Sequence, residues 1–147
     1  MKIALAGAGA FGAKHLDAIK AIGNAEVVSL VGANLEPTRA VAKKYGIGHV
    51  TTDLSEALGR PGVEAAILAT PTPLHAAQAI ACLKAGKHVQ VEIPLADRWS
   101  DAQAVADLQK VTGLTCMVGH TRRFNPSHQW IHRKIAQGEL SIQQMDV

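Results

Sequence analysis

Short apolar runs alternate with segments of helical periodicity from the start of the chain. Residues 2–6 and residues 26–31 are apolar or β-branched runs of the kind that form strands. Between them, Leu16, Ile19 and Ile22 recur at the spacing of one helical face. The pattern predicts a strand, a helix that ends near residue 23, and a second strand.

The same alternation continues along the chain. Further strands are expected at short apolar runs, over residues 49–51, 64–69, 88–91, 115–118 and, as the start of one more strand, 141–147. Helices are expected between them, with Pro37 in a first turn, Gly46 after a last turn, and further helices after residue 53, over 74–85, after residue 100 and over 126–137. Strands joined by short helical crossovers predict an α/β fold: a doubly wound parallel sheet with helices on both faces.

Two helix starts carry a capping-box pattern. Asp53 precedes Glu56 by three residues, and Ser100 precedes Gln103 by the same interval. Each pair is predicted to cap the first turn of the helix that follows. The helix after Ser100 is also expected to turn Val111 toward the core.

The first strand leads into a glycine pattern, GxGxxG, formed by Gly7, Gly9 and Gly12 with Ala10 and Phe11 between them. A strand before it and a helix after it make this the dinucleotide-binding turn of a Rossmann fold. The first glycine permits the turn, the second lets the backbone approach a pyrophosphate, and the third lets helix and strand pack closely. The bland alternative is a tight turn with no ligand.

The end of the second strand bears on the choice of cofactor. An NAD-preferring domain places Asp or Glu there to bind the ribose hydroxyls, whereas this chain has Gly32, Ala33 and Asn34. A carboxylate about 4 Å from a 2′-phosphate would repel it by roughly 4 kcal/mol at an effective dielectric of about 20. Its absence favours NADP, with NAD possible. Asn34, Thr38 and Arg39 could bind the phosphate, although Arg39 could equally be a solvated helix residue.

Composition and charge limit the kinds of molecule that the chain is expected to bind. The net charge is only +3 and the cations are dispersed, which argues against nucleic acid and fits an anionic small-molecule substrate. No stretch approaches the ~20 apolar residues of a membrane span, and the apolar N-terminal run is too short for a signal peptide. The two cysteines and the histidines have no metal-ligand spacing. A cytoplasmic protein without a bound metal is expected.

Three stretches together resemble a known family: GAGAFGAKH, then ATPTPLHAAQAIACLKAGKHVQVEIPLA, then MVGHTRRFNP. They resemble the glucose-fructose oxidoreductase and inositol dehydrogenase family, in this order and over the whole chain. The resemblance implies an NAD(P)-dependent dehydrogenase whose substrate domain follows the nucleotide-binding domain.

The resemblance also implies roles for individual residues. Thr70, Pro71 and His75 match a loop along the ribose and nicotinamide, and Glu92 and Pro94 match the E-K-P signature beside the nicotinamide. His75 could instead simply begin a helix. The proline could only stiffen a turn, and Glu92 could be a solvated carboxylate.

The resemblance also covers a pair of arginines, and the chain departs from the family pattern at one position. Arg122 and Arg123 match cations near the nicotinamide or the substrate, and His120 could be either a buried, hydrogen-bonded histidine or a proton donor. The lysine of E-K-P is Ile93 here, and isoleucine can neither donate nor accept a proton. The catalytic residues are therefore unassigned within the chain, and the resemblance implies a histidine and an aspartate of the second domain.

We expect residues 1–120 to form the dinucleotide-binding domain and residues 121–147 to be a crossover helix and first strand leading to a C-terminal substrate domain that is missing. Alone, this chain should bind cofactor without turnover, and the full-length enzyme should be a homo-oligomer. A non-catalytic NAD(P)-sensing or binding module is the main alternative. A methyltransferase nucleotide-binding domain is weaker, because ATPxxxH and EIP have no place in it.

Overall fold

A computed structural model describes residues 1–144 of the chain. The elements, in chain order, are β1 (Lys2–Ala6), α1 (Ala10–Lys20), β2 (Glu26–Val31), α2 (Leu35–Tyr45), β3 (His49–Thr51), α3 (Leu54–Leu58), β4 (Val63–Leu68), α4 (Thr72–Lys84), β5 (His88–Val91), α5 (Trp99–Thr112), β6 (Cys116–Val118), the 3₁₀-helix η1 (Thr121–Phe124) and α6 (Pro126–Ala136).

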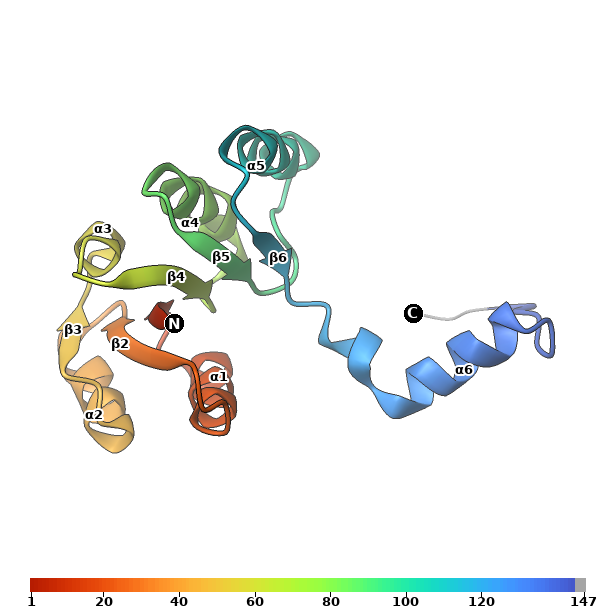
Figure 1. Ribbon diagram of the computed structural model, residues 1–147, viewed down its shortest axis with the longest axis horizontal. Coiled ribbons are helices and arrows are strands. Elements are labelled where there is room, and N and C mark those ends of the chain that lie inside the picture. The colour runs from red at the N-terminus through yellow and green to blue at the C-terminus, as the bar shows by residue number, and fades with distance from the viewer. Residues whose placement is uncertain (145–147) are drawn as a thin grey trace.

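The strands form one six-stranded sheet in the order β3-β2-β1-β4-β5-β6, and every pairing is parallel. The chain begins in the middle of the sheet, builds outward to β3, then returns beside β1 and builds outward to β6 (Figure 1). The strand order therefore reverses between β1 and β4. Ligands of open α/β sheets bind outside the carboxyl ends of the strands at such a point. The predicted doubly wound parallel fold is confirmed.

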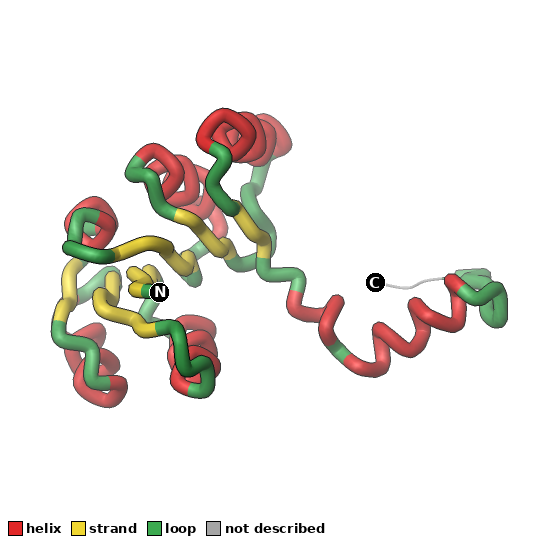
Figure 2. Tube along the Cα trace, viewed as in Figure 1, coloured by secondary structure: helices red, strands yellow, loops and turns green. Residues whose placement is uncertain are grey.

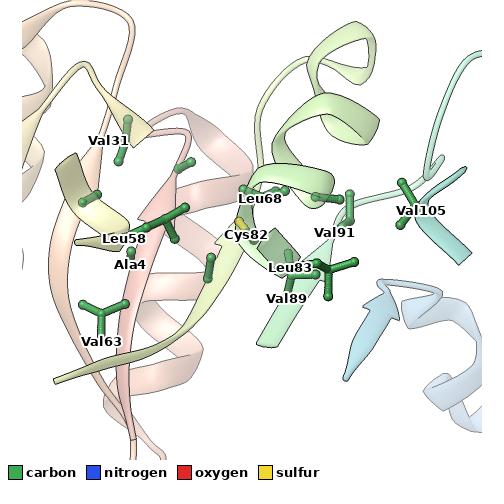
Figure 3. Close-up of a cluster of buried hydrophobic side chains, with 14 residues drawn as sticks. Ala4, Val31, Leu58, Val63, Leu68, Cys82, Leu83, Val89, Val91 and Val105 are labelled. Atoms are coloured by element: carbon green, nitrogen blue, oxygen red, sulfur yellow. The ribbon is translucent and has the colours of Figure 1, made fainter. Parts of the chain in front are cut away.

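Helices cover both faces of the sheet, α1 and α2 on one and α3, α4 and α5 on the other (Figure 2). Successive residues of a strand point to opposite faces. In β1, Ile3 and Leu5 join the core beneath α1 and α2, whereas Ala4 and Ala6 join the opposite core. Figure 3 shows that second core, where Leu83 of α4 packs with strand residues. Small side chains in β1 allow the helices to lie close to the sheet.

The predicted Ser100 cap is wrong. Helix α5 begins at Trp99, its N-cap is Arg98, and no side chain caps it. Val111 is also wrongly assigned to the core, because its side chain is 83% exposed while Val105 is buried. Six residues on from Val105, a 3.6-residue repeat places Val111 roughly 120° around the helix, on the solvent side.

The other capping box is half confirmed. The Asp53 side chain accepts a hydrogen bond from the backbone N–H of Ser55 at 2.8 Å, as an N-cap should. Glu56 does not reach back to Asp53: its carboxylate accepts from the Thr51 hydroxyl and lies 3.2 Å from His49 Nε2. The Thr51 hydrogen bond, followed by that of His49, lowers the pKa of Glu56. Glu56 therefore ties α3 to β3 instead of closing the cap.

Both ends of the predicted pattern need adjustment. Helix α1 ends at Lys20, so Ile22 lies beyond it and is half-exposed. At the other end, residues 141–144 of the strand expected over 141–147 are not in a strand, and residues 145–147 lie outside the described residues. Figure 1 shows η1 and α6 standing clear of the sheet beyond β6. Within residues 1–144, no helix has both the length and the apolar character to cross a membrane.

Candidate functional site

The turn between β1 and α1 is built on close backbone contacts. Gly7 has φ +107°, and a Cβ there would lie 2.2 Å from the carbonyl oxygen of Ala69. A Cβ on Gly12 would lie 1.8 Å from the carbonyl oxygen of Gly7. A Cβ on Gly9, by contrast, would meet nothing within 4 Å. The outer glycines are thus required by the fold, and Gly9 faces open space, as a backbone that contacts a ligand should.

The start of α1 can hold an anion. Gly9 is its N-cap and has no side chain to satisfy the first turn, so the N–H groups of Ala10, Phe11 and Gly12 have no acceptor within the helix. The helix dipole adds partial positive charge at the same place. Phe11 is exposed, and Lys14 Nζ lies 4.8 Å from its ring centroid. A pyrophosphate fits this donor set.

A cleft of about 630 Å³ extends from this turn across the carboxyl ends of β1, β2 and β4. It is lined by Gly7, Ala8, Gly9, Ala10, Phe11, Val31, Gly32, Ala33, Asn34, Pro37, Thr38, Val41, Thr52, Ala69, Thr70, Pro71, Leu74 and Gln78. The predicted residues that line it are Gly7, Gly9, Ala10, Phe11, Ala33, Asn34, Thr70 and Pro71. Gly12 lies directly beneath, against Gly7. The cleft occupies the switch point of the sheet.

The β2–α2 end of the cleft has no carboxylate in its lining. Thr38 is buried there, donates its hydroxyl to the Asn34 carbonyl at 2.7 Å, and fills the space beside Gly32. A Cβ on Gly32 would lie 1.9 Å from Thr38 Oγ1. Arg39 is not brought into the cleft lining, and its guanidinium pairs with Glu36 on the exposed side of α2. The structure thus supports the solvated alternative for Arg39.

His75 lies behind the cleft, not in its lining. Its side chain is buried, with Nδ1 2.7 Å from the Pro94 carbonyl oxygen and Nε2 2.7 Å from the Thr70 carbonyl oxygen. Thr70 also donates its hydroxyl to Gln78 Oε1 at 2.6 Å. The ring therefore connects the loop after β4, where Thr70 lines the cleft, to the loop after β5. His75 does more than begin α4.

Glu92 is paired and largely buried. Its Oε1 lies 2.7 Å from His15 Nε2 on α1, with 14% of the Glu92 side chain and 21% of the His15 side chain exposed. The solvated-carboxylate alternative is therefore wrong. A Cβ on Gly119 would lie 3.2 Å from the same Glu92 oxygen, so β6 also closes on it. Neither Glu92 nor His15 is in the cleft lining, and the neighbouring Ile93 is 46% exposed.

The predicted site residues after β6 do not line the cofactor cleft. His120 is exposed at the start of η1, so the buried-histidine alternative is wrong. Arg122 does not line the cofactor cleft: together with Arg123 it lines a separate pocket against α6. Within residues 1–144, no group of three or more His, Cys, Asp or Glu side chains could hold a metal ion.

Sequence reasoning missed several cleft residues. Leu74 and Gln78 of α4, Val41 of α2 and Thr52 after β3 line the cleft from three separate segments. Leu74 and Gln78 lie within the ATPTPLHAAQ stretch but were given no role, and Val41 and Thr52 belong to no motif. Only the folded sheet brings the four residues to one edge. His15 was also missed as the partner of Glu92, although it follows the glycine pattern by only three residues.

Residues 1–120 match a protein family described as oxidoreductases with an NAD-binding Rossmann fold (GFO/IDH/MocA). Over its whole length the chain is 66% identical to 4-carboxy-2-hydroxymuconate-6-semialdehyde dehydrogenase of a Sphingobium species, and covers 47% of that protein. It is 35% identical over 122 residues to scyllo-inositol 2-dehydrogenase (NAD(+)) of Bacillus subtilis, covering 78% of this chain and 36% of that protein.

Among solved structures, the chain resembles the WlbA dehydrogenase of Bordetella pertussis, in complex with NADH and UDP-GlcNAcA. The TM-score is 0.88 at 32% identity, over 94% of this chain and 40% of that one. The chain thus spans less than half the length of these relatives. With its glycine turn, switch-point cleft and family match in agreement, the chain belongs to the GFO/IDH/MocA oxidoreductase family and forms its NAD-binding Rossmann domain.

Proposed function

We propose that this chain is the NADP-binding half of a cytoplasmic dehydrogenase that oxidises a hydroxyl or hemiacetal substrate. The cofactor, when bound, supplies the nicotinamide ring that accepts a hydride from that substrate. The role of this chain is to bind and orient the cofactor: Gly7, Gly9 and the start of α1 hold its pyrophosphate. Thr70 and Pro71 line the cleft on the β4 side, where we expect them to contact the ribose and nicotinamide.

The observation that carries the proposal is the contrast among the three glycines. Gly7 and Gly12 are packed against backbone, whereas Gly9 faces the open cleft with unpaired helix N–H groups beside it. An open backbone position beside helix N–H donors, in the lining of the cleft, supports a pyrophosphate site at this turn. The cleft also has the size expected of a cofactor site, which ranges from about 300 to 1,000 Å³.

Preference for NADP rests on the β2–α2 turn. A carboxylate that would accept the ribose hydroxyls and repel a 2′-phosphate is missing from the cleft lining. Asn34 is positioned at the N-cap of α2, where its side chain makes no capping hydrogen bond and is free to donate to a phosphate. Arg39 lies one turn further and would have to leave Glu36 to contribute.

The substrate proposal rests on the 66% identity to 4-carboxy-2-hydroxymuconate-6-semialdehyde dehydrogenase. We extend that substrate to this protein, which places it in the breakdown of aromatic compounds. Residues 121–147 are proposed as the crossover into the substrate domain, which would supply the catalytic acid and base and the homo-oligomer contact. Glu92 and Arg122 would lie at the nicotinamide end once that domain is present.

Calorimetric titration of the chain with NADP⁺, NADPH, NAD⁺ and NADH tests the cofactor proposal. We expect NADP(H) to bind at least as tightly as NAD(H) at matched ionic strength. Clearly tighter binding of NAD(H) would overturn the preference, and no binding of either cofactor would overturn the function.

A chimera tests the activity. The chain replaces the corresponding N-terminal part of the Sphingobium enzyme, to which it is 66% identical. We expect the chimera to reduce NADP⁺ with 4-carboxy-2-hydroxymuconate-6-semialdehyde, and the chain alone to show no turnover. A folded chimera that binds NADP⁺ but stays inactive would favour the second candidate.

That second candidate is a non-catalytic NAD(P)-binding module. Ile93 favours it, because an exposed apolar side chain occupies the position of a proton-transferring lysine. The identity to a named dehydrogenase favours catalysis instead.

A further inference from the structure

A second pocket, of about 620 Å³, lies between η1 and α6. Its lining is Arg122, Arg123, His128, Gln129, His132 and Arg133, none of which lines the cofactor cleft. Figure 1 shows both elements well away from the β1–α1 turn. The pocket is therefore separate from the dinucleotide site within this chain.

Local structure brings these side chains together. Asn125 caps α6 by accepting from the Ser127 N–H at 3.0 Å, and Pro126 occupies the first turn. Residues four apart on a helix share a face, so His128 lies beside His132, and Gln129 beside Arg133. The 3₁₀ turn presents Arg122 and Arg123 to that face.

The charge of the lining is uncompensated. No Asp or Glu lines the pocket, and among residues 1–144 the guanidinium groups of its three arginines have no hydrogen bond or ion pair. Elsewhere on the described chain Arg39 pairs with Glu36, and Arg98 with Asp101. Like charges gathered in one pocket repel one another, and a bound anion relieves that repulsion.

We propose that this pocket binds a small molecule with two or more carboxylates, and that it holds the carboxylated end of the substrate; the second statement rests on the proposed function. Guanidinium groups pair with carboxylates through two parallel hydrogen bonds, so several arginines select a multiply carboxylated ligand over a monocarboxylate. No Phe, Tyr or Trp lines the pocket to stack a base, which disfavours a nucleic acid. Phosphate shares the charge but not the planar pairing, and the test separates the two.

Calorimetric titration of the chain with trimesate, benzoate and inorganic phosphate, at low and matched ionic strength, tests the proposal. We expect trimesate to bind at least about tenfold more tightly than benzoate or phosphate, a difference of about 1.4 kcal/mol. The double variant Arg122→Gln/Arg133→Gln should lose at least about tenfold in trimesate affinity. Tighter binding of phosphate than of trimesate would overturn the carboxylate assignment.

A matched control removes the same charge elsewhere. Arg60→Gln/Arg98→Gln lies outside the pocket lining and should leave trimesate affinity unchanged. An equal loss in both double variants would mean diffuse attraction to a basic protein, and no loss in the first would mean another site; either result overturns the proposal. Circular dichroism checks that each variant is folded.

The two proposals fail separately. Gly9→Val, which opposes the cofactor only, should remove NADP binding and leave trimesate binding intact. Wild-type chain that binds trimesate but no dinucleotide would overturn the proposed function and leave the pocket standing. In the converse case, NADP binding without trimesate binding would overturn the pocket alone.

Discussion

The carbonyl oxygen of Gly7 lies 1.8 Å from the place where residue 12 would carry a Cβ. Helix α1 therefore rests directly on the turn that precedes it. Gly12→Ala must push backbone apart, and we expect a loss of roughly 1–3 kcal/mol or more in the free energy of unfolding. Urea denaturation followed by circular dichroism measures it. An unchanged midpoint would mean that the turn is looser than described.

Gly9→Val should leave stability nearly unchanged and abolish NADP binding. The backbone at Gly9 has φ −79° and ψ −164°, which other residues adopt, and the cleft side is open. Stability should change little, by within about 0.5 kcal/mol, while a branched side chain takes the space of the pyrophosphate. NADP binding measured by calorimetry should be lost. A folded variant with wild-type affinity would remove the phosphate from this turn.

The cofactor switch needs two substitutions. Gly32→Asp alone drives its Cβ into Thr38 Oγ1, so it should destabilise the chain by roughly 1–3 kcal/mol. Gly32→Asp/Thr38→Ala makes room, adds an acceptor for the ribose hydroxyls and adds a charge that opposes a 2′-phosphate. We expect the ratio of NAD to NADP affinity to rise at least about tenfold in the double variant. Thr38→Ala alone is the control, and its ratio should change much less than that of the double variant.

His75→Leu should affect both stability and binding. The two carbonyl groups that face the ring, those of Thr70 and Pro94, would lose their partner. A buried carbonyl left unsatisfied costs about 1–3 kcal/mol, so a loss of at least about that size in the free energy of unfolding is expected. NADP binding should weaken as Thr70 shifts. His120→Leu, at an exposed histidine, is the matched control; equal effects in both would contradict the bridging role.

Thiol labelling tests the core beneath α4. Burial raises the pKa of Cys82 to about 12, and burial also raises the pKa of Cys116. Between about pH 8.5 and about pH 12, the native chain therefore keeps the Cys82 thiol protonated. An unfolded chain, with a thiol pKa near 8.5, has lost that proton over the same range. The stability from this thiol is complete below about pH 8.5 and is lost as pH rises toward about 12. At pH 8, iodoacetamide should label Cys82 only after urea unfolding, as mass spectrometry would show; rapid native labelling would contradict the packing.

The succession of strands and helices along the chain and the glycine turn were accessible from the sequence because each depends on neighbouring residues. Apolar runs and their spacing fix strand and helix, and GxGxxG combines a tight turn with a helix start within six residues. Right-handed crossovers predicted that the sheet is doubly wound. Local patterns failed at Val111 and Ser100, where small errors in helix phase and start decide exposure.

Other features depend on contacts between distant segments, so only the tertiary structure decided them. His15 and Glu92 are 77 residues apart in sequence, and they meet because the fold brings α1 next to the residue that follows β5. Thr38 excludes a side chain at Gly32, and His75 turns away from the cleft to bridge two loops. A residue type and its place in a motif indicate what a side chain can do. Burial and partners decide what it does, and both arise only when the sheet brings remote segments together.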